Sequence, residues 1–270
     1  EMCIRDSIYS RDICLVMGIK FTSSEEKFEK FLQPVNNREC EHFKLARKFM
    51  HKKDYRRAIK EYLMSMIFTK PDTLVYKEVS KAYKKIKCYD KAINHLVKAR
   101  TISRFDSEIY YELGLNHLLN ANSDEARKNF IRTIRLNPSN INAQIQLAIS
   151  HELMDEYDMA LSIYQKIIEE NPRYIPAYNH KAGLLITLEE YREASYLFYK
   201  ILKINPAYYR ANLGLGICFD KMNKFSSAIR YYKKYIARKP HSDTTKSLAG
   251  RICEIYSKKH AHKTSLRIVK

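Results

Sequence analysis

Histidines and cysteines are the most reactive side chains of this chain, and their spacing does not form a catalytic or metal site. His117 and His151 stand 34 residues apart in stretches that read as helix, which favours packing between helices over a role as general bases. His260 and His262 supply only two ligands and do not close a metal site. The sequence contains no H-E-x-x-H motif, no G-x-S-x-G motif and no glycine-rich phosphate loop. We therefore expect no enzyme activity, no catalytic residue, no metal and no cofactor.

The six cysteines show no C-x-x-C motif and no regular pairing. Reduced thiols are the expected state, which indicates a reducing compartment and a cytoplasmic location. No stretch approaches the roughly 18 consecutive apolar residues that a membrane-spanning helix needs, so no membrane span is expected.

Small and large residues recur down the chain with a period of 34 residues. One column is alanine six times: Ala58, Ala92, Ala126, Ala160, Ala194 and Ala228. Four residues after each alanine stands a large side chain: Tyr62, Leu96, Phe130, Tyr164, Phe198 and Tyr232. A third column holds small residues: Ala46, Ser80, Gly114, Ala148, Ala182, Gly216 and Gly250. Because residues at i and i+4 share one face of a helix, each unit is predicted to bury that face against a neighbouring helix.

Four of the units also end with a proline, which terminates a helix: Pro138, Pro172, Pro206 and Pro240. Together these columns resemble the tetratricopeptide repeat, a pair of antiparallel helices, from residue 39 to about residue 260. The resemblance implies an all-α fold, a right-handed superhelical solenoid of about six helix pairs plus a C-terminal capping helix. Ile167, Ile201 and Tyr235 occupy positions that are usually small in this family, which predicts looser or rotated packing between the last three units.

The period also predicts the boundaries of the units. We place them at 39–72, 73–106, 107–140, 141–174, 175–208 and 209–242, followed by the capping helix at 243–259 and a basic tail at 261–270. Leu248, Ile252 and Ile255 give the capping helix an apolar side that covers the end of the solenoid at 39–260. Residues 17–38 are predicted to lead into it with a short helix. Residues 1–7 resemble a translated sequencing-library adapter, so residues 1–16 are expected to be an artefact or an unstructured leader.

The net charge of +19 is unevenly distributed along the chain. Lysine and arginine are in excess in the first, second and sixth units and after residue 242, whereas the third unit is neutral and the fourth is acidic. A nucleic-acid track along the whole solenoid would need basic residues in every unit. A nucleic-acid-associated repeat protein that uses its basic terminal units is therefore the alternative function.

The resemblance implies that a partner binds on the concave side, which the first helix of each pair lines in this family. The free faces of the first two such helices predict a basic groove, with Arg47, Lys77, Lys81 and Lys84. The next two predict a largely apolar stretch, with Tyr111, Leu115, Leu118, Asn142, Ile145 and Ile149. The last two add Asn179 and Arg210. The alternative for the apolar side chains is packing on the following first helix.

These surfaces predict a non-enzymatic scaffold or adaptor that binds a protein or peptide segment in its concave groove. Exposed apolar side chains mark docking surfaces, so the expected partner has apolar anchors, with an acidic flank that would face the basic residues. Some members of the family hold chaperone tails through a clamp for the terminal carboxylate. Of the residues at the clamp positions, counted from the second unit, only Lys77 matches, so such a tail is not expected.

Overall fold

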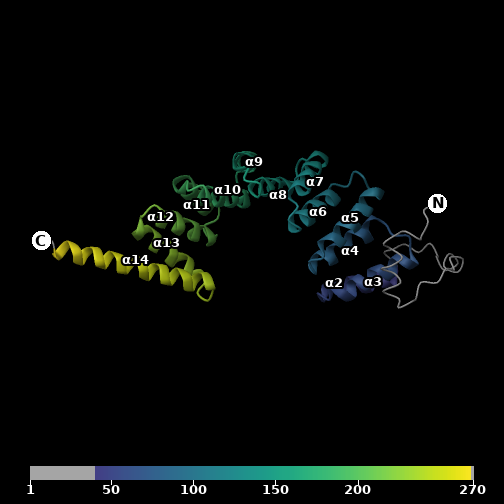
Figure 1. Ribbon diagram of the computed structural model, residues 1–270, viewed down its shortest axis with the longest axis horizontal. Coiled ribbons are helices and arrows are strands. Elements are labelled where there is room, and N and C mark those ends of the chain that lie inside the picture. The colour runs from purple at the N-terminus through teal and green to yellow at the C-terminus, as the bar shows by residue number, and fades with distance from the viewer. Residues whose placement is uncertain (1–39, 269–270) are drawn as a thin grey trace. The chain divides into compact units, whose positions relative to one another are not determined.

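The computed structural model describes residues 40–268, with side chains for residues 40–257 (Figure 1). All regular structure in that range is helical, which confirms the all-α prediction. The predicted leader at 1–16, the short helix within 17–38 and the side chains of His260 and His262 lie outside the described residues.

Thirteen helices follow one another in the described part of the chain. They are α2 (Glu41–His51), α3 (Tyr55–Phe68), α4 (Thr73–Lys85), α5 (Tyr89–Ile102), α6 (Ser107–Leu119), α7 (Ser123–Leu136), α8 (Ile141–Glu152), α9 (Tyr157–Glu170), α10 (Ile175–Thr187), α11 (Tyr191–Ile204), α12 (Arg210–Lys221), α13 (Phe225–Arg238) and α14 (Asp243–Ile268).

These helices form two compact units, which divide between Ser150 and His151 within α8. In the N-terminal unit α2 packs on α3, α4 on α5 and α6 on α7, and neighbouring pairs meet through α3 with α4 and α5 with α6. In the C-terminal unit each helix from α9 to α14 packs on the next. Packing of consecutive helices is the arrangement that the 34-residue period predicts.

The repeated columns form the helix-to-helix seams. All six alanines of the first column have no exposed surface, and the large residues that follow them are at most 4% exposed. The small column lies against those large side chains. A Cβ added to Gly114 would come within 2.5 Å of the Phe130 ring, and one added to Gly216 within 2.3 Å of the Tyr232 ring. Glycine at these two positions therefore makes room for an aromatic ring of the second helix.

The turn between the two helices of each pair has the same backbone in all six units. The last residue before the second helix's N-cap has a positive φ of 58–63°: Lys53, Lys87, Ala121, Asp155, Glu189 and Asn223. The backbone N–H groups of this residue and of the next residue donate hydrogen bonds to carbonyls at the end of the first helix. In the first unit Lys53 donates to Met50 and Asp54 donates to Phe49. This is a Schellman motif, which usually has glycine at the left-handed position. The repeat thus imposes a strained backbone on four residues, Lys53, Lys87, Ala121 and Glu189, whereas aspartate and asparagine tolerate this region more readily.

The predicted loosening of the late units is wrong at the positions that suggested it. Ile167 and Ile201 have no exposed surface and Tyr235 is 7% exposed. Tyr235 packs with the Tyr209 ring at 5.8 Å between centroids, so the larger side chains are accommodated in the core.

Helix α14 covers the end of the C-terminal unit with the apolar side that the sequence predicts. Leu248, Ile252 and Ile255 are buried in one cluster with residues of α13. On its polar side Arg251 donates two hydrogen bonds of 2.9 Å to the Asp220 carboxylate of α12. The helix continues to Ile268 instead of ending at residue 259, so helix occupies most of the predicted basic tail.

Candidate functional site

A hollow of about 290 Å³ lies between α2 and α4, which are the first helices of the first and second helix pairs. Five side chains line it: Phe43, Lys44, Arg47, Leu74 and Glu78. Of these five, Arg47 is the residue that the sequence names for the concave groove. We call this feature the α2–α4 hollow.

The charges around the α2–α4 hollow are unequally compensated. Lys44 pairs with Glu41 at 2.8 Å, and Glu78 accepts hydrogen bonds from Lys81 and from the Tyr62 hydroxyl, both at 3.3 Å. Burial, reinforced by the charge of Glu78, raises the pKa of Tyr62, which keeps this hydroxyl protonated as a donor. Arg47 is exposed, and no carboxylate of the described residues lies within ion-pair distance of it. A ligand carboxylate would therefore meet an uncompensated guanidinium.

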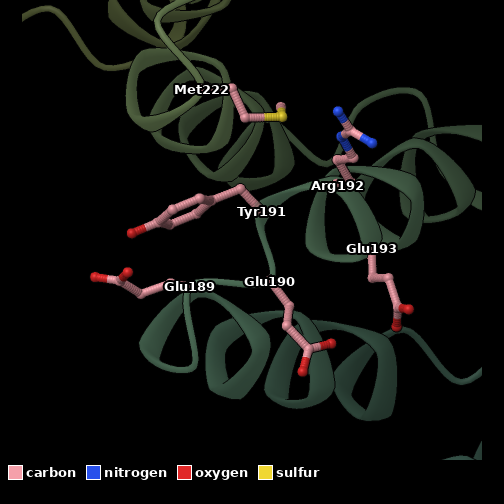
Figure 2. A pocket seen from close by; sticks show the side chains of 6 residues that line it. All are labelled: Glu189, Glu190, Tyr191, Arg192, Glu193 and Met222. Carbon is pink, nitrogen blue, oxygen red and sulfur yellow. The ribbon is translucent and has the colours of Figure 1, made fainter.

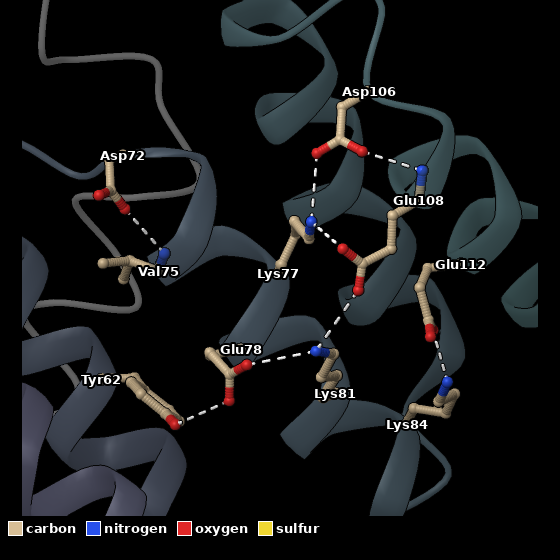
Figure 3. A network of polar contacts seen from close by, with 10 residues as sticks. All are labelled: Tyr62, Asp72, Val75, Lys77, Glu78, Lys81, Lys84, Asp106, Glu108 and Glu112. Atoms are coloured by element: carbon tan, nitrogen blue, oxygen red, sulfur yellow. Dashed lines mark hydrogen bonds and ion pairs between the residues drawn. The ribbon is translucent and has the colours of Figure 1, made fainter. Parts of the chain in front are cut away.

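The three lysines predicted to make a basic groove are all paired with carboxylates (Figure 3). Lys77 contacts Asp106 at 3.1 Å and also Glu108, Lys81 contacts Glu78 and Glu108, and Lys84 contacts Glu112. Burial disfavours the charged form of Lys77, but the hydrogen bonds that Lys77 donates to Glu108 and Asp106 outweigh this effect and raise the pKa of Lys77. The positive charges of the three lysines are thus compensated by carboxylates, and the prediction that the groove is basic is wrong at these positions. The reason is that three of the acidic partners, Asp106, Glu108 and Glu112, come from α6 and the turn before it, while Glu78 belongs to α4 itself.

The predicted apolar stretch is partly open and partly packed. On α6, Tyr111, Leu115 and Leu118 are half-buried, and the next residue, Leu119, is 53% exposed. Tyr111 lies 6.1 Å from Phe130 between ring centroids. We call Leu115, Leu118 and Leu119 the α6 row.

The three candidates on α8 differ in exposure. Ile145 is 5% exposed, so its side chain belongs to the packing and offers little to a partner, whereas Ile149 is half-buried and Asn142 is exposed. The two remaining candidates, Asn179 (half-buried) and Arg210 (exposed), belong to the C-terminal unit. The structure therefore brings one part of the predicted site together around α2, α4 and α6.

A second hollow, of about 340 Å³, lies at the turn between α10 and α11. Figure 2 shows Glu189 and Tyr191 projecting to the same side of this turn, with Met222 reaching in from the end of α12. Glu190, Arg192 and Glu193 complete the lining. Sequence reasoning missed this hollow, because its glutamates read as the solvated ends of two helices.

The described residues contain no group of three or more histidine, cysteine or carboxylate side chains placed to hold a metal ion. His151 is 7% exposed and contacts Glu156, and burial lowers the pKa of the half-buried His117. Both histidines therefore pack against their surroundings, as their spacing favours. None of the helices within residues 40–268 has the length and apolar character of a membrane span.

Comparisons with known proteins identify similar folds. One tetratricopeptide repeat model matches residues 142–174 and another matches residues 185–252. PilW, a type IV pilus biogenesis factor of known structure, is 18% identical with a TM-score of 0.66, and the match covers 77% of this chain and 96% of PilW. YrrB, whose structure is described as a tetratricopeptide repeat protein with an unusual peptide-binding site, is 18% identical with a TM-score of 0.53, covering 72% of this chain and 97% of YrrB.

A tetratricopeptide repeat protein from Parabacteroides merdae is similar in the same way. It is 17% identical with a TM-score of 0.60, and the match covers 77% of this chain and 81% of that protein. No curated protein matches the sequence significantly. At these identities the likeness establishes the fold.

Proposed function

Because this chain belongs to the tetratricopeptide repeat family, we propose that it is a non-enzymatic scaffold that binds a protein or peptide segment. The site we propose combines the α2–α4 hollow with the α6 row, on the first helices of the N-terminal unit. Recognition there would use a preformed surface, because helix packing fixes the positions of the lining residues.

The α2–α4 hollow is the observation on which this proposal rests. Buried Phe43 and half-buried Leu74 give it an apolar lining, while Arg47 gives it a cation without a carboxylate partner among the described residues. Apolar pockets with a few placed polar groups are typical of binding sites. The lysines of α4 already form ion pairs with carboxylates such as Asp106 and Glu112, so Arg47 is the better anchor for an acidic residue of the partner.

The α6 row supports a partner with aliphatic anchors. Leu119 exposes 53% of its surface and follows two half-buried leucines on the same helix. An extended or helical segment with an acidic residue and aliphatic side chains fits both features. The fold likeness to YrrB, a protein described as having a peptide-binding site, agrees with this class of ligand.

A selection from a random peptide library on the purified protein tests the proposal. We expect enriched peptides to share an acidic residue and aliphatic anchors. Arg47→Glu should weaken their binding at least about tenfold, which corresponds to about 1.4 kcal/mol. The matched control is Lys48→Glu, because Lys48 is exposed on the same helix and does not line the hollow.

A second pair of variants tests the apolar contribution. Leu119→Ser should weaken binding, whereas Ile102→Ser should not, because Ile102 is equally exposed (54%) but ends the second helix α5. Equal affinities for all four variants would remove this surface from consideration.

The compartment in which the scaffold works is a further part of the proposal. Cys40, Cys88, Cys218 and Cys253, the four cysteines among the described residues, are free thiols. Free thiols are the usual state in reducing compartments, so we propose a cytoplasmic location. Fractionation of cells that express the tagged protein tests it, and recovery with an oxidising compartment would contradict it.

A further inference from the structure

Helix α13 presents a strongly basic face to solvent. Arg230, Lys233 and Lys234 are exposed, and the 14 residues of the helix include no aspartate or glutamate. Its opposite face, with Ala228, Ile229 and Tyr232, is buried in the core of the C-terminal unit. The exposed cations therefore lie on a helix whose opposite face is fixed by packing in the core.

These cations differ from the lysines of α4 in having no acidic partners. None of Arg230, Lys233 and Lys234 has a carboxylate of the described residues within ion-pair distance, and Lys200 of the neighbouring α11 has none either. Helix α11 contains one acidic residue, Glu193, in its first turn. The positive charge of this surface is thus available to a ligand.

Tyrosine rings hold several of these cations in place. Lys200 Nζ lies 4.7 Å from the Tyr196 ring centroid. The Arg230 guanidinium and Lys234 Nζ lie 5.0 and 5.2 Å from the Tyr231 ring centroid. Cation–π contacts orient a cation and leave its charge in place, whereas a carboxylate would neutralise that charge.

Two of the tyrosines are also open to solvent. Tyr196 is 59% exposed and Tyr199 is 41% exposed, and both lie on the outer face of α11. Tyr199 accepts a hydrogen bond of 3.0 Å from the buried Tyr231, which joins α11 to α13. We define the α11–α13 cationic face by six residues: Tyr196, Tyr199, Lys200, Arg230, Lys233 and Lys234.

We propose that the α11–α13 cationic face binds single-stranded nucleic acid. The four cations would contact successive phosphates, and Tyr196 and Tyr199 would stack with unpaired bases. Exposed aromatic rings beside a basic surface are the combination that single-stranded nucleic acids use. This site differs from the α2–α4 hollow and does not depend on the proposed peptide binding.

The same features disfavour two other anionic partners. A duplex keeps its bases stacked on one another, so the exposed tyrosine rings would contribute nothing to its binding. Insertion into a membrane needs an apolar face, and the apolar face of α13 is buried, which leaves only electrostatic attraction to anionic lipids.

Fluorescence anisotropy with the full chain and a labelled 15-nucleotide oligo(U) tests the proposal. Four phosphate contacts at about 0.7 each predict a slope of about −3 in a plot of log affinity against log salt. Arg230→Glu/Lys234→Glu should weaken binding at least tenfold. Tyr196→Ala should weaken it about tenfold, whereas Tyr196→Phe should keep most of the affinity because the ring remains.

The matched control is Arg56→Glu/Lys60→Glu. It changes the same residue types at the same i, i+4 spacing on another second helix, α3, where both side chains are exposed. An equal loss in both double variants would show attraction by net charge alone and overturn the proposal. Absence of binding, equal affinity for a 15-base-pair duplex, or binding only to phosphatidylserine vesicles would also overturn it.

Discussion

Acidification from pH 7 to pH 5 should destabilise the N-terminal unit through His95 of α5. This histidine is 7% exposed and stacks on Tyr83, with 5.5 Å between the ring centroids and 14° between the ring planes. Its Nδ1 has no hydrogen-bond partner among the described residues. The site therefore accommodates a neutral imidazole and offers a protonated one no compensation.

Burial, followed by repulsion from Lys98 and Lys91, lowers the pKa of His95 from 6.5 to about 4. Between these values the unfolded chain binds a proton that the folded chain does not, so stability is lost as the pH falls below 6.5. At about 1.4 kcal/mol per pKa unit the full loss is about 3 kcal/mol, of which about 2 kcal/mol is already present at pH 5.

The pKa of His95 can be measured directly by an NMR titration of its ring protons. Urea unfolding followed by tyrosine fluorescence at pH 7 and pH 5 gives the stability. His95→Phe retains an aromatic ring beside Tyr83 and should lose about 2 kcal/mol less than the parent between these pH values. All other ionisable groups are common to both proteins, so the difference isolates His95. A titration midpoint near 6.5, or identical losses in the two proteins, would refute the reasoning.

Three further variants test the packing and the turns by chemical unfolding. Gly216→Ala should lower the free energy of unfolding by about 1–3 kcal/mol, because the added Cβ would meet an aromatic ring. Gly183→Ala should instead stabilise α10 by about 0.5–1 kcal/mol, because no atom lies within 4 Å of the added Cβ. Equal effects of the two variants would contradict the packing described. Ala121→Gly should stabilise the chain by up to about 1 kcal/mol because it relieves a φ of 58°, and a loss of stability would argue against strain there. The hydrogen bonds from Arg251 lower the pKa of Asp220 below 3.8. The contribution of Asp220 to stability is therefore present above pH 3.8 and is lost as the pH falls through the lower pKa of the folded state. Asp220→Asn should remove this dependence of stability on acid, and an unchanged pH profile of stability would contradict the pairing.

The sequence predicted the seams between helices because their chemistry repeats in one dimension. Ala126 and the large residue four positions later, Phe130, share a helix face, and both have no exposed surface in the structure. The same reasoning placed Arg47 in the groove, and the structure has it lining the α2–α4 hollow. Whether it binds a peptide stays a prediction.

The compensation of charges could not be predicted, because it depends on contacts between residues far apart in the chain. Lys77 pairs with Asp106, 29 residues further along the chain, so a count of charges within one helix overstates the basic character of α4. Arg251 and Arg230 both belong to the basic C-terminal end, yet Arg251 is paired with Asp220 and Arg230 has no acidic partner among the described residues.

The strained turns were also missed. The positions with positive φ hold residues as different as Lys87 and Asp155, so no residue type marks them in the sequence. The geometry is imposed by the two helices that the turn joins.

The direct measurement of the proposed peptide site is a double-mutant cycle between Arg47 and the acidic residue of a selected peptide. Affinities are measured by calorimetry for the parent protein and Arg47→Gln, each with the parent peptide and with its carboxylate replaced by an amide. If Arg47 binds that carboxylate, the two changes should be coupled by at least about 1 kcal/mol. Effects that add independently would place the peptide elsewhere and contradict the proposed site.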